Sequence, residues 1–335
     1  MKRILLTGGL GYIGSHTCIA LAEHGYTPVV IDNLRNSNIK IKHQIEKINN
    51  EKLEFFELDL MDKDKIKSKV KDVSGIIHFA ALKSVGESVA NPALYYRYNL
   101  GCMLSALDLA KYYQVKSFIF SSSATVYGDL EEVEYFEDMS PGEPLNPYAH
   151  TKSIGEQMLK LDKANHSKMI LRYFNPIGAH KSGEIGELPQ GIPNNLVPFI
   201  TQAAKGKQKK LMVFGDDYNT RDGTCIRDYI HVQDLAYAHA KALDFSIQKQ
   251  NILECLNVGT GKGKSVLEVI KLFEEVNGIK LNFQIGERRP GDKAAFFANA
   301  DKIYDIIGWS PKFTVKDALS DAWKWENNWE KLKLQ

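Results

Sequence analysis

A tyrosine and a lysine, Tyr148 and Lys152, stand four positions apart in a stretch of helical character. Residues four apart in a helix share one face, so both side chains would point in the same direction. A free phenol has a pKa of about 10, too high for a base at neutral pH, but a nearby positive charge favours the phenolate. Ser123, at the end of an upstream strand, could hydrogen-bond the same substrate oxygen. These parts could remove a proton from an alcohol while a hydride leaves to a nicotinamide ring.

The Tyr-x-x-x-Lys spacing alone is weak evidence, because many helices carry it by chance as a packed tyrosine and a surface lysine. It becomes informative only beside a dinucleotide site. His150 lies two positions from both residues, so we expect it on another side of the helix, as a surface or supporting residue. His78 and His231 have no second ligand at suitable spacing, so we expect packing histidines and no bound metal.

The start of the chain carries the glycine pattern of a dinucleotide-binding turn. An apolar run over residues 3–7 leads into Gly9, Gly11 and Gly14, which form G-x-G-x-x-G, and Gly8 adds the spacing G-x-x-G-x-x-G. Glycines at these positions permit a tight turn, the approach of the backbone to a pyrophosphate, and close packing of helix on strand. The free N–H groups and partial positive charge of the helix N-terminus would then bind the pyrophosphate.

A carboxylate follows at the expected distance. Asp32 closes the second apolar run, eighteen positions after Gly14. A carboxylate there accepts hydrogen bonds from the adenosine ribose hydroxyls and repels a 2′-phosphate, so NAD is favoured over NADP. Arg35 argues the other way, since a nearby arginine can hold that phosphate. The alternative for Asp32 is a plain turn residue at a strand end.

These residues need a scaffold of alternating strands and helices. Short runs rich in Ile, Val and Phe predict strands at 3–7, 27–31, 53–57, 75–79, 117–121 and 168–173. Helical patterns lie between them, near 14–23, 39–48, 63–70, 95–113 and 148–164. This alternation predicts an α/β fold, a doubly wound parallel sheet of the Rossmann type. We expect a cofactor-binding domain over 1–175 and a smaller C-terminal α/β lobe over 176–335, with the chain crossing back between them.

Composition limits the partners. The 335 residues carry 43 Lys+Arg against 41 Asp+Glu, a net charge of +2, which argues against a nucleic-acid binder with a broad basic face. The basic run 205–210 favours a solvated turn over a phosphate site. No apolar run approaches the roughly 18 residues of a membrane span, and the apolar start ends at Leu6, too early for a signal peptide. Four scattered cysteines suit reduced thiols. We therefore expect a cytoplasmic protein without membrane attachment.

Longer segments resemble the extended short-chain dehydrogenase/reductases, and the later ones resemble their UDP-glucose 4-epimerase branch. The resembling segments are Thr7–His16, His78–Ser88, Ser121–Gly128, Arg172–His180, Pro189–Leu196, Arg227–Val232 and Arg288–Asp292. They extend over nearly the whole chain. The catalytic helix departs from the frequent family pattern, with Ala-His-Thr between Tyr148 and Lys152 where Gly-Lys-Ser is common. This departure does not affect the roles of those two residues.

The resemblance implies a role for each matching position. Ser123, Tyr148 and Lys152 would be catalytic and would also contact the cofactor. The other implied NAD-binding residues are Gly8, Gly11, Tyr12, Ile13, Gly14, Asp32, Asn33, Asp59, Leu60, Phe79, Ala80, Lys83, Asn99 and Phe174. The implied UDP-sugar residues are Asn175, Asn195, Leu196, Phe214, Arg227, Tyr229, Arg289, Asp292 and Phe296. Two arginines in this set suit a diphosphate, whose charge their planar forks can bind in pairs of hydrogen bonds. Without the resemblance, surface ion pairing with Asp228 and Asp292 would explain them equally well.

The implied reaction interconverts UDP-glucose and UDP-galactose. The sugar 4-hydroxyl would be oxidised, the 4-keto sugar would rotate about its diphosphate link, and tightly bound NADH would return the hydride to the other face. A nucleotide-sugar 4,6-dehydratase is disfavoured, because Ser123 is followed by Ala124 and Thr125 rather than an acid. A UDP-pentose 4-epimerase shares the chemistry and stays open. A non-catalytic NAD(H)-sensing protein would be expected to lack the tyrosine or the lysine.

Two finer expectations follow from the resemblance. Phe296 falls where the pocket wall faces the hexose, so we predict a preference for UDP-glucose and UDP-galactose over the N-acetylated pair. Its alternative is a packed core residue. The helices expected at 95–113 and 148–164 would form the face of a homodimer, as in the family.

Overall fold

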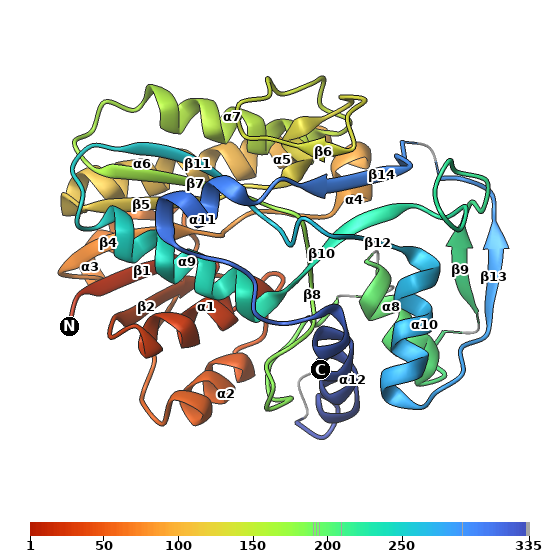
Figure 1. Ribbon diagram of the computed structural model, residues 1–335. Coiled ribbons are helices and arrows are strands. Elements are labelled where there is room, and N and C mark those ends of the chain that lie inside the picture. The colour runs from red at the N-terminus through yellow and green to blue at the C-terminus, as the bar shows by residue number, and fades with distance from the viewer. Residues whose placement is uncertain (190, 192, 194, 209, 290, 333–335) are drawn as a thin grey trace.

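A seven-stranded parallel sheet forms the larger part of the protein (Figure 1). The computed structural model describes residues 1–189, 191, 193, 195–208, 210–289 and 291–332. Gln190, Ile192, Asn194 and Pro290 of the resembling segments, and Lys209 of the basic run, lie outside the described residues. The strands run in the order β11 (Leu253–Val258), β7 (Ser167–Tyr173), β5 (Ser117–Ser121), β4 (Val73–His78), β1 (Arg3–Thr7), β2 (Thr27–Asp32) and β3 (Glu54–Glu57). The predicted doubly wound fold is confirmed.

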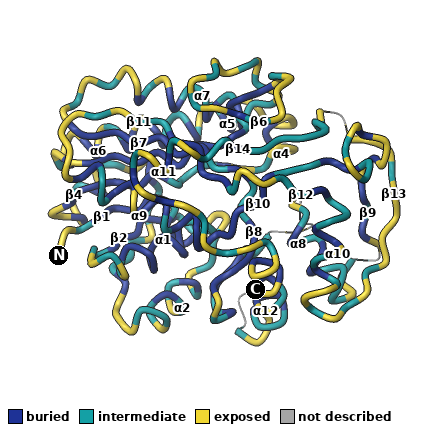
Figure 2. The backbone as a smooth tube through the Cα atoms, viewed as in Figure 1, coloured by how far each residue is buried: buried dark blue, intermediate teal, exposed yellow. Residues whose placement is uncertain are grey.

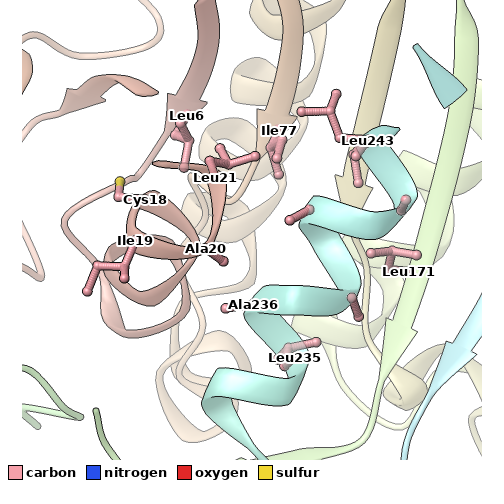
Figure 3. Packing of buried hydrophobic residues seen from close by; sticks show 14 of the residues in the cluster. Leu6, Cys18, Ile19, Ala20, Leu21, Ile77, Leu171, Leu235, Ala236 and Leu243 are labelled. Carbon is pink, nitrogen blue, oxygen red and sulfur yellow. The ribbon is translucent and has the colours of Figure 1, made fainter. Parts of the chain in front are cut away.

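Helices cover both faces of this sheet, which fits the apolar character of its central strands β1, β2 and β4. One face carries α1 (Tyr12–Glu23), α2 (Lys40–Asn49), α9 (Val232–Ser246) and α11 (Asp301–Ile307). The other carries α3 (Lys63–Lys69), α6 (Gly101–Tyr113) and α7 (Pro147–Leu161). Figure 2 shows the central strands buried and the outer turns exposed. Figure 3 shows α1 and α9 side by side next to β1 and β4, with Ala20 and Ala236 between the two helices and Leu243 near the strands.

The chain returns to the large sheet after it has entered the second lobe. Strand β11 pairs with β7 over six residues, and α9 packs beside α1. The division near residue 175 stays a prediction, but residues 232–258 lie on the cofactor side of it in space.

Smaller sheets and helices form the rest of the fold. One sheet has the order β12 (Gly263–Ser265), β10 (Ile226–His231), β14 (Ala295–Ala298) and β6 (Glu134–Tyr135), with β8 (Asn175–Ile177) also paired to β10. Strands β13 (Phe283–Gly286) and β9 (Leu211–Phe214) form a second, two-stranded sheet. Helices α8 (Leu196–Ala204), α10 (Val266–Asn277) and α12 (Val315–Asn328) share a separate core with these strands.

The prediction of one continuous helix over 95–113 is wrong. This segment is divided into α5 (Pro92–Tyr95), a π-helical turn η1 (Tyr96–Leu100) and α6, with the short α4 (Val85–Ala90) before them. Such π-turns are often found at functional sites, and this one carries Asn99, whose buried side chain bonds the backbone of Leu82. The sequence pattern could not show the extra residue because the apolar periodicity continues through it.

The basic run is more than a solvated turn. Lys205 Nζ lies 2.9 Å from Glu330, and Lys207 Nζ lies 2.9 Å from Glu326 and 4.0 Å from the ring centre of Trp329. The two lysines therefore tie the end of α8 to α12. In the described part of the chain, no helix is long and apolar enough to cross a membrane, and no group of three potential metal-binding side chains is found.

Candidate active site

The three predicted catalytic residues come together at the carboxyl edge of the sheet. Ser123 follows β5 and caps the short 3-10 helix η2 (Ala124–Tyr127). Helix α7 begins just before Tyr148, because Asn146 caps it by accepting the Ala149 N–H at 2.9 Å. A hydrogen bond from Ser123 acts on the Tyr148 phenol. Open α/β sheets bind ligands at this edge, outside the carboxyl ends of their strands.

Lys152 is held as a buried cation. It is 5% exposed, and its Nζ donates to the Ser121 carbonyl at 2.6 Å. The same Nζ lies 6.0 Å from the centre of the Tyr148 ring. Burial lowers the pKa of Lys152 to about 8, partly offset by the attraction of Glu156. The ammonium is therefore close to its titration point near neutral pH, as suits a group that stabilises a phenolate.

Tyr148 is a protonated phenol in the absence of ligands. Burial raises the pKa of Tyr148 well above 10, Tyr173 raises it further, and the hydrogen bond from Ser123 works in the opposite direction. The tyrosine thus needs additional positive charge to act as a base. Lys152 supplies one such charge, and a bound nicotinamide ring would supply another.

The glycine turn has an open surface on its ligand side. Gly8 adopts φ +71°, and a Cβ there would lie 2.9 Å from the Ala80 backbone. A Cβ on Gly14 would meet the Gly8 oxygen at 2.6 Å. By contrast, a Cβ on Gly11 would meet only that oxygen, at 3.2 Å. Gly11 is also the N-cap of α1 and has no side-chain cap, so the first N–H groups of the helix are available to an anion, and the turn fits a dinucleotide.

Replacement of Gly14 by alanine should displace this turn. We expect Gly14→Ala to lose most of its bound NAD, because the new methyl group cannot fit against the backbone of Gly8 and Gly9. The NAD released on denaturation, per mole of purified protein, measures the effect. Gly86→Ala is the matched control, since a Cβ at Gly86 in α4 meets nothing within 4 Å; equal NAD content in the two variants would contradict the prediction.

The residues expected to bind the adenosine are already ordered by hydrogen bonds. Asp32, 8% exposed, accepts the Leu10 N–H at 3.1 Å and the Leu34 N–H at 2.9 Å. Asn33 donates to Asp59 at 2.9 Å. Burial raises the pKa of Asp59, but hydrogen bonds from Met61 N–H, Asn33 and Tyr98 outweigh this and lower it overall. Tyr98 was not predicted from sequence, although it directly precedes Asn99.

The remaining cofactor candidates lie around the same edge. Phe79 packs on His239 with ring centres 4.9 Å apart, and the Ala80 N–H donates to Thr7 at 3.4 Å. Leu60 is buried in the core on the α6 side, and Ile13 packs against the α1–α9 core. The Tyr12 hydroxyl donates to the Gly178 carbonyl at 2.7 Å. Asn99 lies below the catalytic helix and donates to Thr151 at 3.0 Å.

The histidines singled out from the sequence have structural partners. His78 bonds Thr7 at 2.8 Å and packs beside Phe118 and Phe120. His231 caps α9 through the Gln233 N–H at 3.0 Å. His150 bonds the Tyr96 hydroxyl at 2.9 Å, on a side of α7 away from Ser123.

Two arginines and an aspartate form a charged group in the second lobe. Asp292 lies 3.2 Å from Arg227 and 3.0 Å from Arg289, one carboxylate oxygen to each. The Arg289 guanidinium stacks over Phe214, 4.9 Å from its ring centre, and Phe214 is exposed. Tyr229 is buried two residues after Arg227. A cation pair beside an exposed aromatic ring can hold a diphosphate and stack a base.

The predicted pocket wall is a cluster of aromatic rings. Phe296 on β14 lies with its ring centre 5.0 Å from Phe174 and 4.7 Å from Tyr135. The Phe296 ring thus packs against its neighbours, and the residue is only partly buried. Asn175 donates to the Asp228 carbonyl at 3.0 Å, which fixes the start of β8 beside β10.

One acidic residue that contacts two of the predicted site residues was missed from the sequence. Glu187 accepts hydrogen bonds from Lys83 at 3.3 Å and from Asn195 at 3.0 Å. Leu196 begins helix α8 directly after Asn195. Lys83 and Asn195, expected on the cofactor and the sugar nucleotide respectively, thus meet at one carboxylate. Nothing in the sequence pattern distinguishes Glu187 from other loop acids.

A serine, a tyrosine and a lysine at the carboxyl edge of a Rossmann sheet, beside a glycine turn, define the class of short-chain dehydrogenase/reductases. Residues 5–322 match the family described as GDP-mannose 4,6 dehydratase. The UDP-glucose 4-epimerase of Bacillus subtilis (strain 168) is 46% identical over 330 residues, 97% of each chain. The chain belongs to this family and, within it, to the UDP-glucose 4-epimerases.

Solved structures support the same assignment. The UDP-glucose-4-epimerase from Stenotrophomonas maltophila, with bound NAD and formylated UDP-arabinopyranose, superposes with a TM-score of 0.96 at 40% identity and covers 99% of each chain. The UDP-glucose 4-epimerase from Bifidobacterium longum, in complex with NAD+ and UDP, gives 0.92 at 41% identity over 98% of each chain.

Proposed function

We propose that this protein interconverts UDP-glucose and UDP-galactose by transient oxidation at C4 of the sugar. The observation that carries the proposal is that Ser123, at the end of β5, and the pair Tyr148 and Lys152, on α7, lie together at the carboxyl edge of a sheet that also carries the glycine turn. The 46% identity to an epimerase over nearly full length supports it.

NAD is the cofactor that the residues fit. The open face of Gly11 and the uncapped start of α1 suit its pyrophosphate, and Asp32 lies at the position for the adenosine ribose. Bound NAD would accept the hydride from C4 and return it. Because no net oxidation results, we expect the cofactor to stay bound and to need no exchange.

The protein's own residues then do three tasks. Tyr148 removes the proton from the 4-hydroxyl, and Ser123 hydrogen-bonds the same oxygen. Lys152 keeps positive charge beside the phenol. Arg227 and Arg289 hold the diphosphate, while the sugar makes fewer fixed contacts and the 4-keto sugar can turn over. Hydride return to the opposite face then inverts C4.

Conversion without added nucleotide tests the proposal. Purified protein should form UDP-glucose from UDP-galactose with no nicotinamide cofactor supplied, and the absorbance of bound nicotinamide should change when the sugar nucleotide is added. A preparation that contains NAD yet converts neither sugar would refute it. Binding of the sugar nucleotide with neither turnover nor an absorbance change would instead favour a non-catalytic sensor of the sugar nucleotide.

Two related reactions are weighed against this one. A 4,6-dehydratase, the name of the matching family, must eliminate water after oxidation and needs an acid beside the catalytic serine. Here Thr125 follows instead and donates its hydroxyl to Ser123 at 3.0 Å. A UDP-pentose 4-epimerase is the second candidate, since a solved relative binds a formylated UDP-arabinopyranose. Turnover on four UDP-hexoses and two UDP-pentoses separates the candidates.

Phe296 should restrict the size of the sugar. The wild type is expected to prefer the UDP-glucose pair over the N-acetylated pair, because the Phe296 ring occupies space beside Phe174. Phe296→Ser should raise kcat/KM for the N-acetylated pair relative to the glucose pair by about tenfold or more. Competition assays with both substrate pairs measure the ratio. Equal use of both pairs by the wild type would refute the prediction.

We also propose a cytoplasmic homodimer. Leu104 and Tyr112 on α6 and Leu161 at the end of α7 are exposed apolar residues on the helices expected to form the dimer face. The free thiols of all four cysteines suit a reducing compartment. Residues 1–175 would hold NAD and 176–335 the UDP-sugar, with α9 and β11 returned to the first. Light scattering at micromolar concentration, compared with Leu104→Lys, tests the dimer.

A further inference from the structure

A buried ion pair lies directly beneath the catalytic residues. Arg172 on β7 is 1% exposed and Glu156 on α7 is 2% exposed. The Arg172 Nη2 lies 2.7 Å from Glu156 Oε2, and its Nε lies 3.0 Å from Oε1. Ser122, the neighbour of Ser123, donates to the same Oε1 at 2.6 Å. Glu156 is thus held by the strand that precedes the substrate lobe and by the serine run.

This pair joins three elements that must stay in register for the reaction. Glu156 stands one helical turn after Lys152 and two after Tyr148, so it lies close below both on α7. Ser122 lies between Ser121, whose carbonyl accepts from Lys152, and Ser123. Arg172 is two residues before Phe174 and stacks over Tyr127, 4.9 Å from its ring centre. A rotation of α7 would therefore disturb these contacts.

The pair also sets charge near the reacting groups. The side chains facing Lys152 and Tyr148 are His78 on β4, Tyr95 on α5, Tyr173 on β7, His239 on α9 and Glu156 on α7. Burial lowers the pKa of His78 to about 3 and of His239 to about 4, so both are neutral at working pH. The two facing tyrosines have raised pKa values and are also neutral. Glu156, which pairs with Arg172, is the acidic side chain in this set.

The groups around Arg172 keep its guanidinium charged. Burial disfavours the Arg172 cation, but the hydrogen bond with Glu156 raises its pKa overall. Lys160 lies 4.0 Å from Glu156, and Tyr127 and Cys255 face Arg172 as neutral groups with pKa values raised by burial. The loop carbonyl of Glu137 accepts from Arg172 at 3.4 Å.

We propose that the Glu156–Arg172 ion pair is a positioning element for the epimerase reaction: it fixes the helix that carries Tyr148 and Lys152 against the strand end that carries Ser123, and its balanced charge sets the potential at Tyr148 and Lys152. The inference rests on the proposed function for its kinetic consequence. A buried pair is weak evidence for stability alone, since apolar replacements are often neutral. We infer instead that the Glu156–Arg172 pair holds α7 in position and balances the charge near Tyr148 and Lys152.

Two variants separate the geometric from the electrostatic effect. Glu156→Gln leaves Arg172 without its counter-charge, so the pKa values of Tyr148 and Lys152 should both fall and the whole profile of kcat against pH should move about one unit lower. Glu156→Gln combined with Arg172→Met removes both charges. Its profile should return to the wild-type position, while kcat at the optimum stays at least about tenfold low, with KM within about twofold.

Glu54→Gln is the matched control. Glu54 binds Arg3 in the same two-pronged way, at 2.6 and 2.8 Å, but on β3 and β1 at the far end of the sheet. The Glu54→Gln variant should leave both the maximum kcat and the position of the pH profile unchanged. An unmoved profile in Glu156→Gln, or a wild-type kcat in the double variant, would overturn the proposal. If Glu156→Gln does not fold, the double variant still gives this second result.

Spectroscopic titration without substrate keeps this inference separate from the proposed function. The tyrosinate absorbance of Tyr148 is obtained by subtracting the signal of the same protein with Tyr148→Phe. Its midpoint should lie lower in Glu156→Gln than in the wild type. A shifted midpoint in a protein that converts no UDP-galactose would refute the function and leave the positioning role intact. An unshifted midpoint in an active enzyme would refute the positioning role alone.

Discussion

Tyr148→Phe should reduce the conversion of UDP-galactose by about 10²- to 10⁴-fold, the range that a positioned general base contributes. The phenylalanine keeps the ring in its buried place but removes the oxygen that accepts the proton from the sugar. KM should change little, because Arg227 and Arg289, which we propose hold the diphosphate, are left unaltered beside Asp292. Steady-state kinetics with both sugar nucleotides measures the effect.

The control for this variant is a tyrosine hydroxyl of structural type. Tyr113 on α6 donates to the Val70 carbonyl at 3.1 Å, on the side of the sheet away from the cleft edge. Tyr113→Phe should keep wild-type turnover. Near wild-type turnover in Tyr148→Phe would mean that another group removes the proton, and would refute the proposed mechanism.

Lys152→Met should have the second largest effect, a loss of about 10²-fold or more in kcat. The variant removes the cation beside the phenol and leaves the Ser121 carbonyl without its donor. The pH dependence should change as well. Burial lowers the pKa of Lys152 to about 8, so in the wild type the ammonium is present below that pH and is lost above it. Wild-type kcat should therefore fall as the pH rises through about 8, and this fall should be absent in Lys152→Met.

A second buried lysine provides the comparison. Lys168 on β7 is 4% exposed and donates to the Ala164 carbonyl at 2.9 Å, away from the carboxyl edge of the sheet. Lys168→Met should retain both the turnover and the alkaline fall. If the alkaline limb persists in Lys152→Met, a different group is responsible for it, and the assigned role of the ammonium is wrong.

The part of the protein expected to bind the cofactor could be predicted from local features of the chain. The glycines of the first turn, the strand before them and the helix after them are neighbours in sequence, so steric requirements alone limit them to one arrangement. The same holds for Tyr148 and Lys152, because helical periodicity places them on one face. Alternating apolar runs likewise predicted the large sheet and most of its helices. The π-turn at Asn99 was not predicted, because one inserted residue hardly alters the apolar pattern of the sequence.

The substrate half depended on contacts between distant segments. Asp292 meets Arg227 across 65 residues, and Glu187 meets Lys83 across 104, and no periodicity encodes such pairings. Resemblance to a family named these residues, but their mutual geometry came from the packed structure.

The sequence by itself determined the class of chemistry: a glycine turn, an acid at the end of the second strand, and a tyrosine and a lysine one helical turn apart. Tertiary structure alone decided which elements return to the first sheet, β11 and α9, and that Glu156 and Arg172 are buried together beside the site. The physical reason is that the first set is restricted by the local backbone. The second set forms only when burial of the two cores brings remote side chains within hydrogen-bond distance.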